Sequence, residues 1–242
     1  MKRILPTICV STFITLPLQL TYAHDLAPAM RHFKEQFTQD LSHWTIEQQP
    51  NGKTGIQEGQ LVINDDAGAT VWFHERLHSP LRIRFQVQVA SSGRISDINM
   101  FWMARDPSTP ENLFHDSHTR NGRFNSYRGL ETYYASIGGN DNQTTRFRRY
   151  DGLGNRPLRP EHDLRIETGW IQPDTPILIE LTAVHGKVQV FRDGALIFEF
   201  DDSEFLASGW FGIRTVNSHL KVDFVEIVSV AFPASGKANY PR

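Results

Sequence analysis

Short segments with alternating hydrophobic and polar residues recur through most of this chain. From about residue 56 onward they are rich in β-branched and aromatic residues, and turn signals separate them. Segments of this kind predict β-strands, so we expect an almost entirely β protein. The predicted strand regions are 59–65, 69–77, 81–90, 97–105, 130–139, 144–150, 177–200, 209–216 and 220–230.

A helical pattern is found only near the start of the chain. In "DLAPAMRHFKEQF", Met30, Phe33 and Phe37 are spaced by three and four residues, which predicts a short N-terminal helical segment. Farther along, the compact turns "VHGK" and "RDGA" predict a three-stranded meander over 177–200. Many short antiparallel strands in one domain, residues 24–242, predict an all-β, double-sheet jelly-roll sandwich.

The first 23 residues have the pattern of a cleavable secretory signal peptide. Lys2 and Arg3 precede an apolar stretch that ends in small or compact residues, and cleavage after Ala23 is expected. Polar and proline residues interrupt the stretch, so a retained membrane anchor is disfavoured. Cys9, the single cysteine, lies in this segment, which leaves the mature chain without disulfides or a thiol nucleophile. We expect a periplasmic or secreted protein.

Charge is balanced overall but uneven along the chain. A net charge of -2 and a pI near 6.5 argue against a protein that coats nucleic acid or an anionic membrane through bulk electrostatics. Between residues 114 and 150, however, basic and aromatic residues far outnumber acidic ones, most densely in "QTTRFRRYDG". Binding of an anion must therefore be local. The residues of this stretch are His115, His118, Arg120, Arg123, Tyr127, Arg128, Tyr133, Tyr134, Arg146, Arg148, Arg149 and Tyr150.

Strand alternation predicts which of these side chains share a face. If strands 130–139 and 144–150 pair through the "GGNDN" turn, then Tyr134 shares one face with Arg146, Arg148 and Tyr150. Arg149 falls on the other side and is expected to be structural. The opposite, core-facing set is Tyr133, Ala135, Ile137 and Phe147.

The C-terminal half resembles a known superfamily. The hairpin "GKVQVFRDGALIFEF", an edge-like strand "GWFGIRTV" and the closing strand "LKVDFVEIVSV" are similar to concanavalin A-like lectin/glucanase jelly rolls. With "NMFWMARDP" and "RPLRPEHDL", the chain resembles an uncharacterised bacterial family that accompanies polysaccharide-utilisation genes. The superfamily includes lectins, glycoside hydrolases and polysaccharide lyases, so the resemblance implies a glycan ligand and leaves the activity open.

The basic stretch suits an acidic polysaccharide or oligosaccharide, and our leading hypothesis is a lyase that cleaves a uronate polymer by β-elimination. Arginine forks bind carboxylates, so Arg146 and Arg148 would neutralise the uronate. Tyr134 would act as the acid or acid/base, and His115 or His118 would assist removal of the proton at C5. This chemistry requires no cofactor.

Further residues are candidates for substrate binding. Tyr150 shares the face of the two arginines, and Trp210 beside Arg214 offers a ring next to a guanidinium group, a natural sugar platform. Arg123 belongs to the basic stretch. Asn99 lies on the opposite strand face from Trp102, so at most one of them lines the groove.

Two other functions stay open. The first is a non-catalytic glycan-binding module that uses the same groove. The second is a glycoside hydrolase whose carboxylates lie in "EHDLRIE", Glu161, Asp163 and Glu167, although the last gap is one residue too long for the retaining jelly-roll motif. "INDDAG" offers oxygen ligands for a structural calcium ion, on the weak basis of two adjacent acids.

Overall fold

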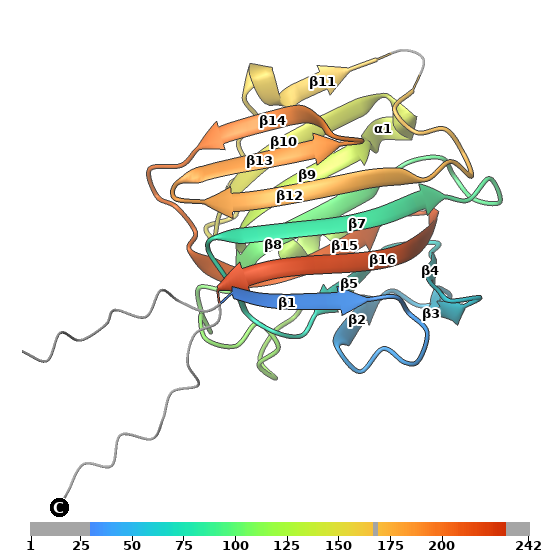
Figure 1. Cartoon of the computed structure of the whole chain (residues 1–242), viewed down its shortest axis with the longest axis horizontal. Coiled ribbons are helices and arrows are strands. Elements are labelled where there is room, and N and C mark those ends of the chain that lie inside the picture. Colours follow the sequence, from blue (N-terminus) through green and yellow to red (C-terminus); the bar gives the residue numbers. More distant parts are fainter. Residues whose placement is uncertain (1–29, 167–168, 231–242) are drawn as a thin grey trace, which may run out of the picture.

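The computed structural model describes residues 30–166 and 169–230, and it shows a nearly all-β sandwich of two antiparallel, eight-stranded sheets (Figure 1). This confirms the predicted jelly-roll class. The predicted signal peptide and Cys9 lie outside the described residues. Within the described part of the chain, no helix is long and apolar enough to cross a membrane.

The two sheets are built from strands far apart in the sequence. Sheet A has the order β14 (Ala195–Asp201), β13 (Lys187–Arg192), β12 (Ile177–Val184), β7 (Leu81–Val89), β16 (His219–Val230), β4 (Gln60–Asn64) and β3 (Lys53–Gln57), with β1 (Met30–Glu35) also paired to β16. Sheet B has the order β11 (Asp163–Arg165), β10 (Thr144–Asp151), β9 (Glu131–Gly138), β8 (Ile98–Arg105), β15 (Ser208–Thr215), β5 (Ala69–Phe73) and β2 (Trp44–Gln48), with β6 (Leu77–His78) also paired to β15. The short helices are η1 (Phe124–Tyr127), α1 (Gly139–Asn142) and η2 (Pro160–His162).

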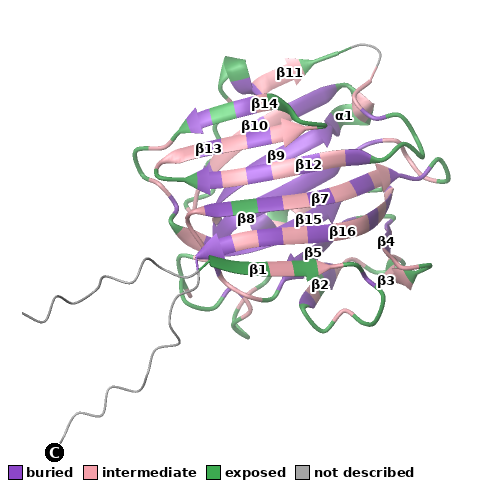
Figure 2. Ribbon diagram, in the orientation of Figure 1, coloured by how far each residue is buried: buried purple, intermediate pink, exposed green. Residues whose placement is uncertain are grey.

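The main core lies between the sheets, and sheet A contributes one face to it. Along β7, buried residues such as Ile83 and Phe85 alternate with more exposed ones such as Arg82. Figure 2 shows this alternation as bands along the strands of sheet A. Hydrophobic positions at every second residue therefore specify the inner face of this sheet.

The centre of sheet B is buried on both faces, because residues 106–130, which we call the covering segment, pack over part of its outer face. All residues of β8 except the last are buried. On the outer face the Trp72 ring stacks on Phe101 at 5.5 Å, and Tyr127 of the covering segment stacks on Phe101 at 5.4 Å. Gly212 permits this arrangement, since a Cβ there would lie 2.6 Å from the Trp72 ring. A second, smaller hydrophobic core results.

Two local predictions are confirmed. Strands β12, β13 and β14 form the predicted meander, and its turns place His185–Gly186 and Asp193–Gly194 at positive φ, as tight hairpins require. Strands β9 and β10 pair through the turn at α1, with Arg148 opposite Tyr134 and Arg146 opposite Ser136. The expected core set of Tyr133, Ala135, Ile137 and Phe147 is buried between the sheets.

Two other predictions are wrong. Met30–Glu35 is not helical but forms strand β1, paired along its length with β16. Phe33 contacts Phe73 at 4.6 Å and Met30 is 51% exposed, so the apolar spacing reflects an edge strand rather than a helix face. Strand β15 is not edge-like either, because it lies between β8 and β5 near the middle of sheet B.

Candidate functional site

One row of polar side chains crosses the outer face of sheet B from edge to edge. Each member is the direct cross-strand partner of the next, so all project from the same face. A carboxylate stands at each end, and between them are hydroxyl, amide and guanidinium groups. We call this the polar row: Asp163, Arg146, Ser136, Asn99, Arg214, Thr70 and Glu47.

The polar row divides into an open half and a covered half. Arg146, Ser136 and Asn99 line a pocket of about 370 Å³, although little of the Ser136 and Asn99 side chains is exposed. Arg214, Thr70 and Glu47 are buried and do not line this pocket. Strands β8, β9 and β10 supply the pocket floor, and Phe124 of the covering segment contributes to its lining. The lining residues are Arg94, Asp97, Asn99, Phe124, Tyr134, Ser136, Gly139, Asn140, Thr144, Arg146, Arg148, Arg156 and Val216.

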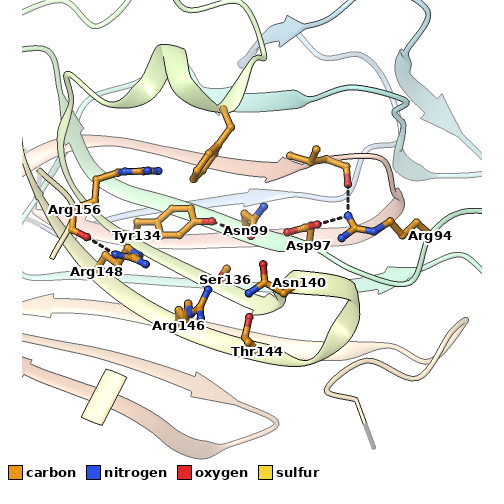
Figure 3. Close-up of a pocket in the computed structure, with 13 residues that line it drawn as sticks. Arg94, Asp97, Asn99, Tyr134, Ser136, Asn140, Thr144, Arg146, Arg148 and Arg156 are labelled. Carbon is orange, nitrogen blue, oxygen red and sulfur yellow. Dashed lines mark hydrogen bonds and ion pairs between the residues drawn. The ribbon is translucent and has the colours of Figure 1, made fainter. Parts of the chain in front are cut away.

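Tyr134 and Asn99 occupy the centre of this pocket. The Tyr134 hydroxyl donates a hydrogen bond of 3.1 Å to Asn99 Oδ1, and Figure 3 shows the pair between Arg148 and Arg156 at one end and Asp97 and Arg94 at the other. Burial raises the pKa of Tyr134 above its ordinary value, and the nearby acidic groups act in the same direction. The phenol is therefore kept protonated, and it can donate a hydrogen bond or a proton.

Two of the pocket's arginines already have carboxylate partners. Arg94 lies 2.7 Å from Asp97 and 2.7 Å from Asp141, while Arg146 Nε donates to Asp163 at 2.7 Å. Desolvation opposes the charge on Arg94, yet its bonds to Asp141 and Asp97 raise the pKa of that guanidinium overall. The positive charge of these two groups is thus compensated within the protein.

Arg148 and Arg156 differ, because neither has an ion pair with any described carboxylate. Arg148 Nη1 donates to the backbone carbonyl of Arg156, and the Arg156 guanidinium lies 5.0 Å from the Phe124 ring centroid and 5.7 Å from that of Tyr150. Burial lowers the pKa of Arg148, and the positive charges of Arg146 and Arg156 lower it further. Arginine remains protonated at neutral pH, so this end of the pocket carries uncompensated positive charge.

The covering segment removes three predicted binding residues from the surface. Tyr150 and Arg214 are 0% exposed and Trp210 is 4% exposed, so the expected open sugar platform is wrong. Arg214 Nη1 donates to the Gly122 carbonyl at 2.6 Å and to Thr70 Oγ1 at 3.1 Å. The bond to Gly122 holds the covering segment against the sheet, whereas Thr70 belongs to strand β5 of the sheet itself.

The two candidate histidines and Arg123 also fall outside the pocket. His115 is exposed and His118 is partly buried on the covering segment, and His115 Nδ1 lies 2.9 Å from Ser117 Oγ. Arg123 is exposed immediately before η1, with no side-chain partner among the described residues. The structure therefore brings together Tyr134, Arg146, Arg148 and Asn99 from the sequence-based set.

Several lining residues are missed by the sequence reasoning. Arg156 follows β10 in the loop "GLGNRP", while Arg94 and Asp97 precede β8 in another loop. Strand alternation carries no information about where loop side chains point, so no periodic signal identifies them. Arg149 is structural as expected, with Nε 3.4 Å from Asp202 Oδ2 and Nη1 donating to the Tyr150 carbonyl.

The carboxylates of the hydrolase hypothesis are not arranged as a free pair. Asp163 is paired with Arg146 and Arg165, Glu161 is exposed in η2, and Glu167 lies outside the described residues. Asp65 of "INDDAG" accepts backbone hydrogen bonds from Ala67 and Asn217. Within residues 30–166 and 169–230, no group of three or more His, Cys, Asp or Glu side chains is arranged to hold a metal ion.

Solved structures with this fold include several carbohydrate-related proteins. A Bacillus subtilis protein of unknown function with a galectin-like fold is 17% identical, with a TM-score of 0.62 over 82% of this chain and 96% of that chain. The carbohydrate-binding module CBM66 from Bacillus subtilis is 11% identical, with a TM-score of 0.53 over 75% and 92%. An endo-β-1,3-glucanase from Pyrococcus furiosus is 12% identical, with a TM-score of 0.54 over 83% and 94%. At such low identity the likeness concerns the fold alone.

Sequence comparison identifies the chain only at the level of a family. No curated protein matches it. A family model described as a domain of unknown function matches residues 63–225, which span both sheets and the whole pocket floor. The chain therefore belongs to this family, DUF6250.

Proposed function

We propose that this protein is an exported glycan-binding domain whose pocket on sheet B binds an acidic saccharide. The observation that carries the proposal is the uncompensated charge of Arg148 and Arg156 in a pocket where Arg94 and Arg146 are neutralised. A carboxylate or sulfate would supply the missing partner through charge-assisted hydrogen bonds. Carbohydrate-binding modules and lectins among the structural neighbours are consistent with a glycan ligand.

The neutral groups of the pocket would bind sugar hydroxyls. Asn99, Ser136 and Asn140 present amide and hydroxyl groups next to the charged end. Each can both donate and accept a hydrogen bond, as a hydroxyl of a sugar requires. The volume of about 370 Å³ is in the range of small-ligand sites and suits one or a few sugar units.

Binding is tested by titration calorimetry of the mature protein with a panel of uronate, sulfated and neutral oligosaccharides. We expect preferential binding of acidic members and a loss of about tenfold or more in affinity for Arg148→Ala. Arg82→Ala is the matched control. Arg82 is exposed on sheet A, and its substitution removes the same charge far from the pocket. Equal affinity for neutral glycans, or an unchanged Arg148→Ala protein, would contradict the proposal.

A second candidate is a lyase acting on a uronate polymer, and the Tyr134 hydroxyl in the pocket favours it. The guanidinium groups would neutralise the uronate carboxylate, and a base would take the C5 proton as the C4–O bond breaks and the C4=C5 double bond forms. Tyr134, kept protonated, would give its proton to the departing oxygen. The described lining contains no histidine, however, so the base is not identified, and binding without cleavage is the better-supported function.

The two candidates are separated by incubating the protein with uronate polysaccharides and recording the ultraviolet absorbance of an unsaturated uronate. A lyase would produce this absorbance, and Tyr134→Phe would abolish it while leaving binding intact. Retention of the polysaccharide without absorbance or new reducing ends would support the binding domain. New reducing ends alone would indicate hydrolysis.

A further inference from the structure

A second, shallower hollow adjoins the pocket, and the two share Arg156. Arg156 lines both the pocket and the second hollow. On the pocket side, its backbone carbonyl accepts a hydrogen bond from Arg148 Nη1. The second hollow lies where the end of η1 meets the loop after β10. The same helix and loop also contribute Phe124 and Arg156 to the pocket lining. Its lining consists of Arg128, Asp151, Gly154, Asn155, Arg156 and Pro157.

The charge of this second hollow is positive. Asp151 is its acidic member, but the carboxylate of Asp151 turns back into its own loop. It accepts hydrogen bonds from Leu153 N at 2.8 Å, Asn155 N at 3.0 Å and Asn155 Nδ2 at 2.6 Å. Arg128 is exposed and, among the described residues, has no ion pair. The guanidinium groups of Arg128 and Arg156 outnumber this single carboxylate, so the hollow keeps a net positive charge that can attract an anion from solution.

The loop that forms the second hollow is also held in place. Gly152 N donates to the Leu130 carbonyl at 3.2 Å, and Asp151 N donates to the Asn155 carbonyl at 3.4 Å. The Arg156 side chain is supported by the Phe124 and Tyr150 rings. A surface that is already ordered loses little conformational entropy when a ligand binds, so it can contribute to affinity.

We propose that the second hollow is a further subsite, which binds the next acidic unit of the same glycan. Arg148, Arg156 and Arg128 then form a continuous cationic path, and the ligand class is narrowed to an oligosaccharide with acidic groups on neighbouring sugars. This inference rests on the proposed glycan binding at the pocket. Arg128 determines the preference for longer oligosaccharides, whereas Arg148 binds saccharides of every length.

The test is titration calorimetry with galacturonate, glucuronate, mannuronate and guluronate, each as a monosaccharide and as a homotrisaccharide, on the mature wild-type protein and three variants. We expect Arg128→Ala to weaken trisaccharide binding by about tenfold and to leave monosaccharide binding unchanged. Arg148→Ala should weaken both lengths, and Arg82→Ala should change neither. The Arg128 side chain is exposed and unpaired, so its removal leaves the fold intact, as a denaturation curve can verify.

Three other outcomes overturn the inference in distinguishable ways. If the monosaccharide and trisaccharide bind with equal affinity in the wild-type protein, the second hollow is not a subsite. If Arg128→Ala and Arg82→Ala weaken the trisaccharide to the same small extent, Arg128 contributes only to bulk charge. If no uronate of either length binds, the proposed function fails and this inference fails with it.

Discussion

The two halves of the polar row carry similar groups on the same sheet face, but only the open half lines a pocket. In the covered half, Arg214 has no described carboxylate partner and is held by the Gly122 carbonyl and by aromatic rings 5.0 and 5.2 Å away. In the open half, Arg146 is paired with Asp163 beside a pocket. The covering segment packs over Arg214 and leaves the pocket beside Arg146 open. A buried polar group depends on partners that the fold supplies, and Arg214 Nε and Nη2 have no hydrogen-bond partner among the described residues.

The covered half ends in a buried ion pair that joins the sheet to the covering segment. Glu47 Oε1 lies 3.1 Å from Arg120 Nη2, with side-chain exposures of 4% and 2%, and Glu47 Oε2 accepts a hydrogen bond of 3.0 Å from Trp72 Nε1. Arg120 Nη1 also lies 3.7 Å from Asp106 Oδ2, so this guanidinium has two carboxylate partners. Charges buried in this way depend on each other, because solvent cannot compensate them. We expect substitutions at this pair to cause the largest losses of stability.

Glu47→Ala should lower the free energy of unfolding by about 3 kcal/mol, since the buried Arg120 charge keeps only its longer carboxylate contact of 3.7 Å with Asp106. Chemical denaturation measures this loss. The control is Glu180→Ala, which breaks a part-exposed pair with Arg84 on the outer face of sheet A. That variant should lose less than about 1 kcal/mol. Similar losses in the two variants would mean that the covered half is not held by this ion pair.

Gly122→Ala should lower the free energy of unfolding by about 1–3 kcal/mol. Gly122 has φ of +88°, and a Cβ there would lie 2.4 Å from the Gly68 carbonyl oxygen, where the covering segment meets the turn before β5. Gly129→Ala is the control in the same segment, because a Cβ at that position meets nothing within 4 Å. Denaturation curves compare the two. An unaffected Gly122→Ala protein would show that the close contact is not needed for docking.

Asp163→Asn should have the smallest effect, less than about 1 kcal/mol, because the pair with Arg146 is partly exposed. Its hydrogen bond from Arg146 lowers the pKa of Asp163 below the ordinary 3.8. The stabilisation is therefore present above about pH 3.8 and is lost as the pH falls through the lower folded-state pKa. Stability measured from neutral to acidic pH should show the wild type and the variant converging. A constant difference would assign no pH-dependent role to this pair.

Sequence reasoning succeeded in the open half where regular strands carry the residues. Alternation placed Tyr134, Arg146 and Arg148 on one face, and the β9–β10 register agrees. It also placed Trp210 and Arg214 on the outer face, correctly, but could not indicate that they are covered. A strand pattern reports which face a side chain occupies and carries no information about what later packs on that face.

The loop residues of the site could not be predicted for a related reason. Arg156 and Phe124 reach the pocket from segments without periodicity, and their positions depend on contacts with residues elsewhere in the chain. His115 and His118 share the basic stretch with Tyr134 in the sequence, but the covering segment carries them elsewhere. Proximity along a chain indicates proximity in space only within a regular element.

The sequence by itself determined the β class, the hairpin turns and the face on which each strand residue lies, because these follow from local alternation and turn chemistry. Only the tertiary structure decided that β1 joins sheet A, that the covering segment buries Arg214, and that Arg148 and Arg156 meet without an acidic partner. Those outcomes depend on packing between residues distant in the chain. The charge of "QTTRFRRYDG" was therefore visible in the sequence, whereas which part of it stays uncompensated became visible only in the fold.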